Sequence, residues 1–224
     1  MRQTGRVAEY ANLLTLPDEF ALLLHKPNGS CYVSASPNAA TAAAEIGELV
    51  LRGRMVPHGT AVQLRDTASS GQPWMDRLLA EFQRAAGREN HPVELGWWLA
   101  LRSTAFAAHR SVLVERGVLR VERRKFLGVL PDDRYHPDRA IRTALLTELH
   151  ALAREEVLVD GRLALLGTLV HRSGLVHALD FHRAERSRLR ALADREDLGD
   201  HVGPEVTATL LALTAIPTAT ALPS

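Results

Sequence analysis

The feature that most constrains the fold is a helix stop signal that recurs three times, in which an apolar, helix-periodic stretch ends on Arg-Gly or Ser-Gly. It occurs in residues 48–54 (ELVLRGR), 114–119 (VERGVL) and 172–174 (RSG). A glycine just after the last apolar residue of a helix can adopt the left-handed conformation that closes the helix. After the second stop, residues 118–122 alternate in polarity, which is typical of a half-buried strand. The sequence therefore predicts helices that end abruptly and pass into short strands.

Apolar periodicity and turn-forming residues predict a mainly α fold, a single-domain helical bundle with two small β-hairpins. Helices are expected from residue 16, over 38–52, from 74, over 92–116, over 141–152, from 163, over 175–192 and from 204. The hairpins are expected to pair 55–57 with 61–64 and 118–122 with 126–130, with the turn of the second hairpin at 123–125. Residues 1–13 are expected to form a flexible lead-in, 14–216 a single helical domain and 217–224 a disordered tail.

Two of these helices carry further information. Ala40, Ala43 and Gly47 share one stripe of residues 38–52, and such small side chains predict close packing deep in the bundle. Residues 92–116 keep one apolar stripe throughout, so we predict a single long central helix there. The three tryptophans fall at helical positions and are expected in the core rather than on a base-stacking surface: Trp74, Trp97 and Trp98.

Bulk composition narrows the class of protein. The 27 basic and 26 acidic residues leave a formal net charge of +1, so attraction to nucleic acid or anionic lipid must come from local clusters. Cys31 is the single cysteine, which excludes an intramolecular disulfide or a cysteine-built zinc site and fits a reducing compartment. No stretch approaches the ~20 apolar residues that span a bilayer. We expect a cytoplasmic protein whose membrane contact, at the inner face, is peripheral.

The sequence contains no recognisable catalytic motif. There is no glycine-rich phosphate loop, no nucleophile elbow and no supported cysteine–histidine pair. His171, His177 and His182 are spaced by six and five residues, so they neither share one helix face nor match His-Glu-x-x-His. We therefore predict that the protein is not an enzyme, and that it has no catalytic residue, no metal site and no cofactor.

The second hairpin is the best candidate for a functional surface. Arg123, Arg124 and Lys125 lie beside Phe126 and Leu127, so electrostatic and apolar contacts with a membrane would combine, each cation contributing about 1 kcal/mol near an anionic surface. The alternative is a solvated turn whose apolar neighbours pack inward. A second basic stripe is interrupted by Glu185 and is interpreted as a solvated face rather than a phosphate site: Arg183, Arg186 and Arg190.

Several stretches keep the order and spacing of a known family. They are residues 14–24 (LTLPDEFALLL), 48–54, 70–73 (SGQP) leading to 75–79 (MDRLL), 113–119 (LVERGVL) and 160–166 (DGRLALL). In these stretches the chain resembles a bacterial member of the Golgi phosphoprotein 3 family. The resemblance implies a largely helical bundle with a protruding hairpin, here 118–130, for membrane insertion and self-association. Eukaryotic members are phosphatidylinositol 4-phosphate effectors, which implies a peripheral membrane protein.

The residues that hold the lipid headgroup in the eukaryotic members are replaced. A tryptophan and three arginines of that pocket correspond to Val33, Ala42, Ser103 and Phe106. Because each charge-assisted hydrogen bond is worth roughly 1.5–3 kcal/mol, the loss of three arginines predicts the loss of ordinary specific recognition. Nearby arginines could substitute if the alignment slips or the ligand differs: Arg102 and Arg110.

Three functions follow as hypotheses. The first is a non-enzymatic peripheral membrane or adaptor protein, whose partners would be an anionic lipid or phosphoinositide headgroup, a protein, or a second copy bound through the second hairpin. The second is a winged-helix-like regulator that binds nucleic acid, since residues 113–119 precede a basic hairpin; the near-neutral charge and the alanine-rich residues 105–112 argue against it. The third is an accessory small-molecule-binding protein of a biosynthetic pathway that uses the bundle interior.

Overall fold

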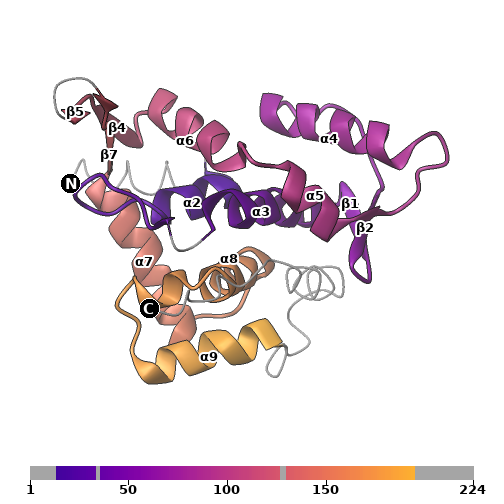
Figure 1. Ribbon diagram of the computed structural model, residues 1–224. Coiled ribbons are helices and arrows are strands. Elements are labelled where there is room, and N and C mark those ends of the chain that lie inside the picture. The colour runs from indigo at the N-terminus through magenta and orange to yellow at the C-terminus, as the bar shows by residue number, and fades with distance from the viewer. Residues whose placement is uncertain (1–13, 34–35, 127–129, 195–224) are drawn as a thin grey trace, which may run out of the picture.

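A computed structural model describes residues 14–33, 36–126 and 130–194, and the eight α-helices in this part form three layers (Figure 1). The central layer consists of α2 (Leu16–Leu23) and α3 (Pro37–Leu51). On one side of it lie α4 (Pro73–Ala86), α5 (Leu95–Leu101) and α6 (Ala105–Glu115). On the other side lie α7 (Arg139–Ala153), α8 (Gly161–Arg172) and α9 (Arg183–Asp194). Both central helices contact α6 and α8. The predicted mainly α fold with small hairpins is confirmed.

The central helices are buried on every side. All eight residues of α2 are buried, although two of them are acidic, and α3 is buried from Ala40 to Val50. The two helices approach so closely that a Cβ on Gly47 would lie 2.9 Å from Cδ2 of Leu16. The prediction that small residues place this helix deep in the bundle is therefore confirmed.

The first hairpin is confirmed and belongs to a three-stranded antiparallel sheet. Strands β1 (Met55–His58) and β2 (Ala61–Leu64) pair as expected, and β3 (Val93–Glu94) adds to β2. This sheet packs with α4, α5 and the end of α3 around a second hydrophobic cluster that includes Phe82 and Trp98. Helix α3 thus packs both against the other helices of the bundle and against this sheet.

The prediction of one long central helix over residues 92–116 is wrong. The segment contains β3, α5 and α6, with a break between the two helices at residues 102–104. Arg102 leaves helical geometry at the end of α5 (φ −84°, ψ 46°), and its side chain turns inward to Glu45. The break also divides the apolar stripe, and Trp97 is 54% exposed, so its predicted place in the core is wrong. Trp98, and Trp74 in α4, are buried as expected.

The second hairpin is longer than predicted. Strand β4 (Leu119–Glu122) pairs with β7 (Arg134–Pro137), and β5 (Lys125–Phe126) pairs with β6 (Leu130–Pro131). The predicted turn at 123–125 and return strand at 126–130 are therefore wrong. Residues 123–124 instead connect the two pairs of strands, and the Asp132 N–H donates to the carbonyl oxygen of Arg124 at 2.9 Å. The two hairpins lie at opposite ends of the molecule (Figure 1).

The later helices follow local signals except in one stretch. The side chains of Asp138 and Asp160 cap α7 and α8, which confirms the helix predicted after Asp160. Residues 175–192 are not one continuous helix, because a 3₁₀ turn (η2, Leu175–His177) and a bend at Asp180 (φ 58°) precede α9. The expected lead-in at 1–13, the helix from residue 204 and the tail at 217–224 lie outside the described residues.

Candidate functional site

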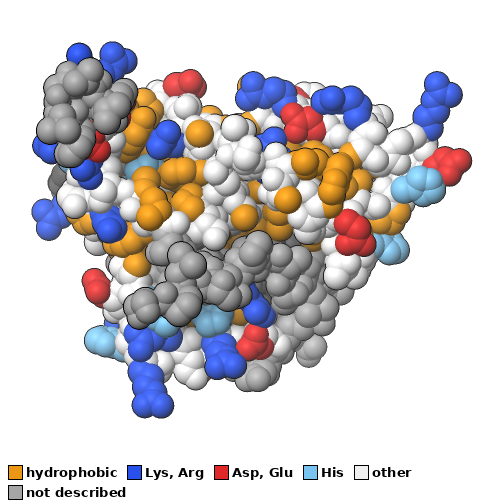
Figure 2. Space-filling model, in the orientation of Figure 1, with side chains coloured by type: hydrophobic (Ala, Val, Ile, Leu, Met, Phe, Trp, Pro, Cys, Tyr) orange, Lys and Arg blue, Asp and Glu red, His pale blue; other side chains and the backbone are white. Residues whose placement is uncertain are grey.

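The cations of the second hairpin lie at its midpoint rather than at its tip. Arg123, Arg124 and Lys125 are all exposed, and Lys and Arg side chains gather around this hairpin (Figure 2). Arg124 pairs with Glu122 at 2.8 Å, whereas no acidic partner of Arg123 or Lys125 is found in the described part of the chain. The predicted apolar contacts involve Leu127 and the side chain of Phe126, which lie outside the described part of the chain.

The four positions that correspond to the eukaryotic headgroup pocket differ in exposure. Val33 is 79% exposed and Ser103 is exposed, but Ala42 and Phe106 are buried in α3 and in the first turn of α6. The Phe106 N–H donates to Asn38 Oδ1 at 3.2 Å, which fixes α6 against the start of α3. Two of the four side chains are thus part of the helix packing.

The two arginines that could substitute in this pocket differ sharply in their surroundings. Arg102 donates to Glu45 at 2.8 and 3.1 Å and to Glu81 at 3.1 Å, so its charge is already compensated. Arg110 is half-buried, and its guanidinium lies 4.3 Å from the ring centroid of Tyr135 and 5.4 Å from that of Phe106. Of the two, Arg110 is the one whose charge is left for a ligand.

Arg110 belongs to a group of side chains at the base of the second hairpin that we call the basic aromatic cluster: Lys26, Tyr32, Phe106, Arg110 and Tyr135. The Lys26 Nζ lies 4.8 Å from the ring centroid of Tyr32. Backbone hydrogen bonds fix the cluster, because the Tyr135 N–H donates to the carbonyl oxygen of Gly29 and the Tyr32 N–H to that of Leu24, each at 2.9 Å. A guanidinium that is stacked and held in this way is preorganised to bind a phosphate.

The positive charges of this region act on two neighbouring titratable groups, Cys31 and His25. Burial raises the pKa of the Cys31 thiol, and the positive charges of Arg110 and Lys26 oppose that shift. Burial, together with the positive charges of Arg110 and Arg142, lowers the pKa of His25 to about 4 against the opposing effect of its hydrogen bond to the Ala21 backbone. His25 is therefore neutral at physiological pH, and the cluster carries the two charges of Lys26 and Arg110.

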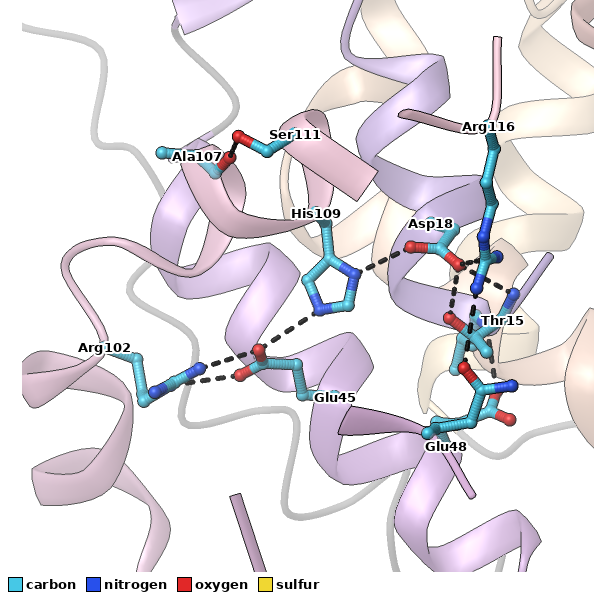
Figure 3. A network of polar contacts seen from close by, with 11 residues as sticks. Thr15, Asp18, Glu45, Glu48, Arg102, Ala107, His109, Ser111 and Arg116 are labelled. Atoms are coloured by element: carbon cyan, nitrogen blue, oxygen red, sulfur yellow. Dashed lines mark hydrogen bonds and ion pairs between the residues drawn. The ribbon is translucent and has the colours of Figure 1, made fainter. Parts of the chain in front are cut away.

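A separate polar network lies inside the bundle (Figure 3). His109 on α6 contacts Asp18 of α2 through Nδ1 at 2.8 Å and Glu45 of α3 through Nε2 at 3.2 Å, and all three side chains are at most 1% exposed. Arg116 Nη1 donates to Asp18 at 3.0 Å. Because its centre is closed to solvent, this network joins the three helices rather than binding a ligand.

The other candidates from the sequence remain structural. No group of three or more histidine, cysteine or acidic side chains within the described ranges could hold a metal ion. In the α9 stripe, Arg186 donates to the carbonyl oxygen of Phe181 at 3.1 Å and Arg190 to Asp194 at 3.4 Å. The described helices include none that is both long and apolar enough to cross a membrane.

A family model for Golgi phosphoprotein 3 (GPP34) matches residues 16–213. The chain belongs to the Golgi phosphoprotein 3 family. A comparison with curated proteins gave no match. The match extends from α2 through all the described helices, so the central layer, both hairpins and the basic aromatic cluster lie within the family region.

Sequence reasoning missed three members of the cluster. Lys26 and Tyr32 flank the turn-rich residues 27–30, and such a turn brings its two ends together, which was a usable signal. Tyr135 had no comparable signal. It is 25 positions from Arg110 in the chain, and only the pairing of the long hairpin brings the two side chains together.

Proposed function

We propose that this Golgi phosphoprotein 3 family member is a non-enzymatic peripheral membrane or adaptor protein that docks on anionic lipid through one basic face. The face combines the hairpin cations with the basic aromatic cluster. The observation that carries the proposal is their continuity: Tyr135, which stacks on Arg110, is paired in β7 with Val121 of β4, directly before the exposed cations.

The two parts of the face would have different roles. The hairpin cations would act through long-range attraction, at about 1 kcal/mol for each cation near an anionic surface. Lys26 and Arg110 would contact one lipid phosphate, with the guanidinium already oriented by Tyr135. Two cations are fewer than the four pocket residues that the family resemblance implies, so we expect binding to anionic lipid in general, without selection for phosphatidylinositol 4-phosphate.

Co-sedimentation with vesicles tests this function. The vesicles would contain neutral lipid, generic anionic lipid or phosphatidylinositol 4-phosphate, each at low and at physiological salt. Changing Arg123, Arg124 and Lys125 together to Ala should weaken binding to anionic vesicles roughly 100-fold, from about 3 kcal/mol of lost attraction. Phe126→Asp should remove the binding that persists at high salt, because that remainder depends on apolar contact.

A matched control separates the face from net charge. Arg77, Arg84 and Arg88 are exposed on or just after α4, away from the second hairpin, and their triple change to Ala removes the same charge. This variant should bind anionic vesicles almost as the unchanged protein does. Equal losses in both triple variants would contradict docking through one face, and unchanged binding after the hairpin changes would contradict the proposal itself.

The nucleic-acid alternative is supported less well by α6. The outward side chains of this helix are small or acidic, namely Ala107, Ala108, Ser111 and Glu115, and Ser111 Oγ donates to the carbonyl oxygen of Ala107 at 3.1 Å. Such side chains offer few donors or acceptors to base edges. Duplex DNA titrated over a salt series therefore serves as the negative arm of the vesicle experiment, and tight DNA binding would favour the winged-helix reading instead.

A further inference from the structure

Helix α5 turns two large apolar side chains away from the core. Trp97 is 54% exposed and Leu101 is 58% exposed. They are four residues apart, so they lie one turn apart on the same face of the helix. A Cβ added at Gly96 would meet no atom of another element within 4 Å, so the surface beside them is open. Figure 2 shows hydrophobic side chains gathered over this helix. We call Trp97 and Leu101 the tryptophan patch.

The opposite face of α5 is fixed by packing and by ion pairs. Trp98 is buried, and its ring centroid lies 3.8 Å from that of Phe82 on α4. Directly after the helix, Arg102 pairs with Glu45 of α3 at 2.8 Å and with Glu81 of α4 at 3.1 Å. These contacts prevent α5 from rotating about its axis to bury the patch. The exposure of the patch is therefore a consequence of the tertiary packing.

The surface that leads from the patch to the basic aromatic cluster is uncharged. Every exposed position from residue 96 to residue 111 is glycine, alanine, serine, threonine, leucine or tryptophan. Helix α6 is 11 residues long, about 16 Å, and it connects the patch to Arg110, which stacks on Tyr135 at the hairpin base. The hydrophobic side chains over α5 and the cations around the second hairpin are seen on one face of the molecule (Figure 2). The patch and the basic face are thus two ends of one surface.

We propose that the tryptophan patch is a second membrane anchor, which enters the interfacial region of the bilayer when the basic face docks. This role rests on the proposed function, because the basic face brings the patch to the lipid. An indole ring combines an apolar body with a polar N–H, and tryptophan is for this reason enriched at membrane–water interfaces. Leu101 would reach the acyl chains beside it, and no exposed charge between residues 96 and 111 would have to leave water.

The size of the patch favours a bilayer over a protein partner. A tryptophan and a leucine that are each just over half exposed offer roughly 200 Å² together, whereas a specific protein interface buries about 800 Å² on each partner. The uncharged surroundings also lack the charged groups that fix the register of a protein complex. A bilayer requires neither a complementary shape nor a fixed register.

Tryptophan fluorescence of the full chain on vesicles tests this anchor. Anionic vesicles at low salt hold the protein through its cations, and lipids brominated on their acyl chains quench a tryptophan that enters the bilayer. Trp74 and Trp98 are 8% and 4% exposed, so the quenched emission belongs to Trp97. We expect a loss of up to one third of the total emission, because one of the three tryptophans is accessible, and no loss in Trp97→Phe.

Two leucine variants make the test specific. Leu101→Asp should weaken binding to anionic vesicles at least ~10-fold and remove the binding that persists at high salt, since stable attachment takes two anchors. Leu158→Asp is the matched control, because this leucine is 90% exposed and lies between α7 and α8, on the other side of the central layer. It should bind as the unchanged protein does. Phe126→Asp should keep the quenching of Trp97 at low salt, which separates the patch from the hairpin.

The remaining outcomes would overturn the second anchor. Vesicle binding without quenching, together with equal affinities of Leu101→Asp and Leu158→Asp, would show that the patch stays in water and would leave docking through the basic face intact. Absence of vesicle binding altogether would contradict both the anchor and the proposed function. A dimer in native mass spectrometry that Leu101→Asp dissociates, with no quenching on vesicles, would assign the patch to a second copy of the chain.

Discussion

Replacing His109 with leucine removes the side chain that links two buried carboxylates across three helices. Asp18 would keep Arg116 and Thr15 as partners, and Glu45 would keep Arg102. Neither acid would keep the bond to the imidazole, at 2.8 Å for Asp18 and 3.2 Å for Glu45. Leucine has a similar size, so the loss is mainly electrostatic.

The structure sets the magnitude in two ways. Burial alone lowers the pKa of His109, but hydrogen bonds to Asp18 and Glu45 overcome this effect and raise the pKa to about 9, above the usual 6.5. At about 1.4 kcal/mol per pH unit, the difference corresponds to about 3 kcal/mol. Removing one partner from a buried ion pair costs a similar ~3–5 kcal/mol. We therefore expect His109→Leu to lower the free energy of unfolding by about 3–5 kcal/mol at pH 6.5.

The pH dependence identifies the cause. Because the folded pKa of His109 lies above the unfolded one, the stabilisation is fully present below about pH 6.5 and is lost as the pH rises through about 9. The difference in unfolding free energy between the unchanged protein and the variant should thus shrink towards pH 10. The contribution of Glu19, whose pKa is raised to about 8, changes over part of this range but is common to both proteins and cancels.

Urea unfolding from pH 6 to pH 10 measures this difference. Far-UV circular dichroism should be followed beside tryptophan fluorescence, because the Trp74 ring lies edge-on to His109 with its centroid at 4.9 Å and the change alters its surroundings. His91→Leu, at a side chain that is 71% exposed, is the control and should leave stability unchanged. A loss that stays constant from pH 6 to pH 10 would refute the argument, since it would show that packing rather than charge is responsible.

Two further changes test the packing that positions the sites. Gly29→Ala should lower the unfolding free energy by ~1–3 kcal/mol in the same urea assay, because φ of Gly29 is +81° and an added Cβ would lie 2.9 Å from the Cβ of Arg134. Unchanged stability of this variant would show that the turn can shift away from the hairpin. Phe82→Ala should cost ~3–5 kcal/mol, since this ring is fully buried with its centroid 3.8 Å from that of Trp98, and a smaller loss would mean that the second cluster collapses around the cavity.

Local chemistry was sufficient to predict most of the helix ends. Gly53, Gly117 and Gly174 all have positive φ, between 65° and 76°, as the three stop signals required. The side chain of Asp160 caps α8 by accepting a hydrogen bond from the Leu163 N–H at 2.7 Å. These features depend on a residue and its neighbours within one turn, and the sequence displays such neighbours directly.

The errors arose where distant residues override a local pattern. The apolar stripe of residues 92–116 favours one helix, yet Arg102 breaks it to reach Glu45, 57 positions earlier. The alternation after Gly117 indicates a strand, but the length of the hairpin depends on its pairing with residues 134–137. Neither the partner nor the pairing register is visible in the local pattern.

The amino-acid sequence by itself determined the fold class, the stop signals, the small-residue central helix and the family. Only the tertiary structure decided what each charged residue does. Arg102 and Arg110 are of one type and eight positions apart, but one is compensated by two acids and the other stacks on Tyr135 at the hairpin base. The physical reason is that helix propensity is a property of near neighbours, whereas the energy of a charge depends on its burial and on partners that the folded chain brings from far away.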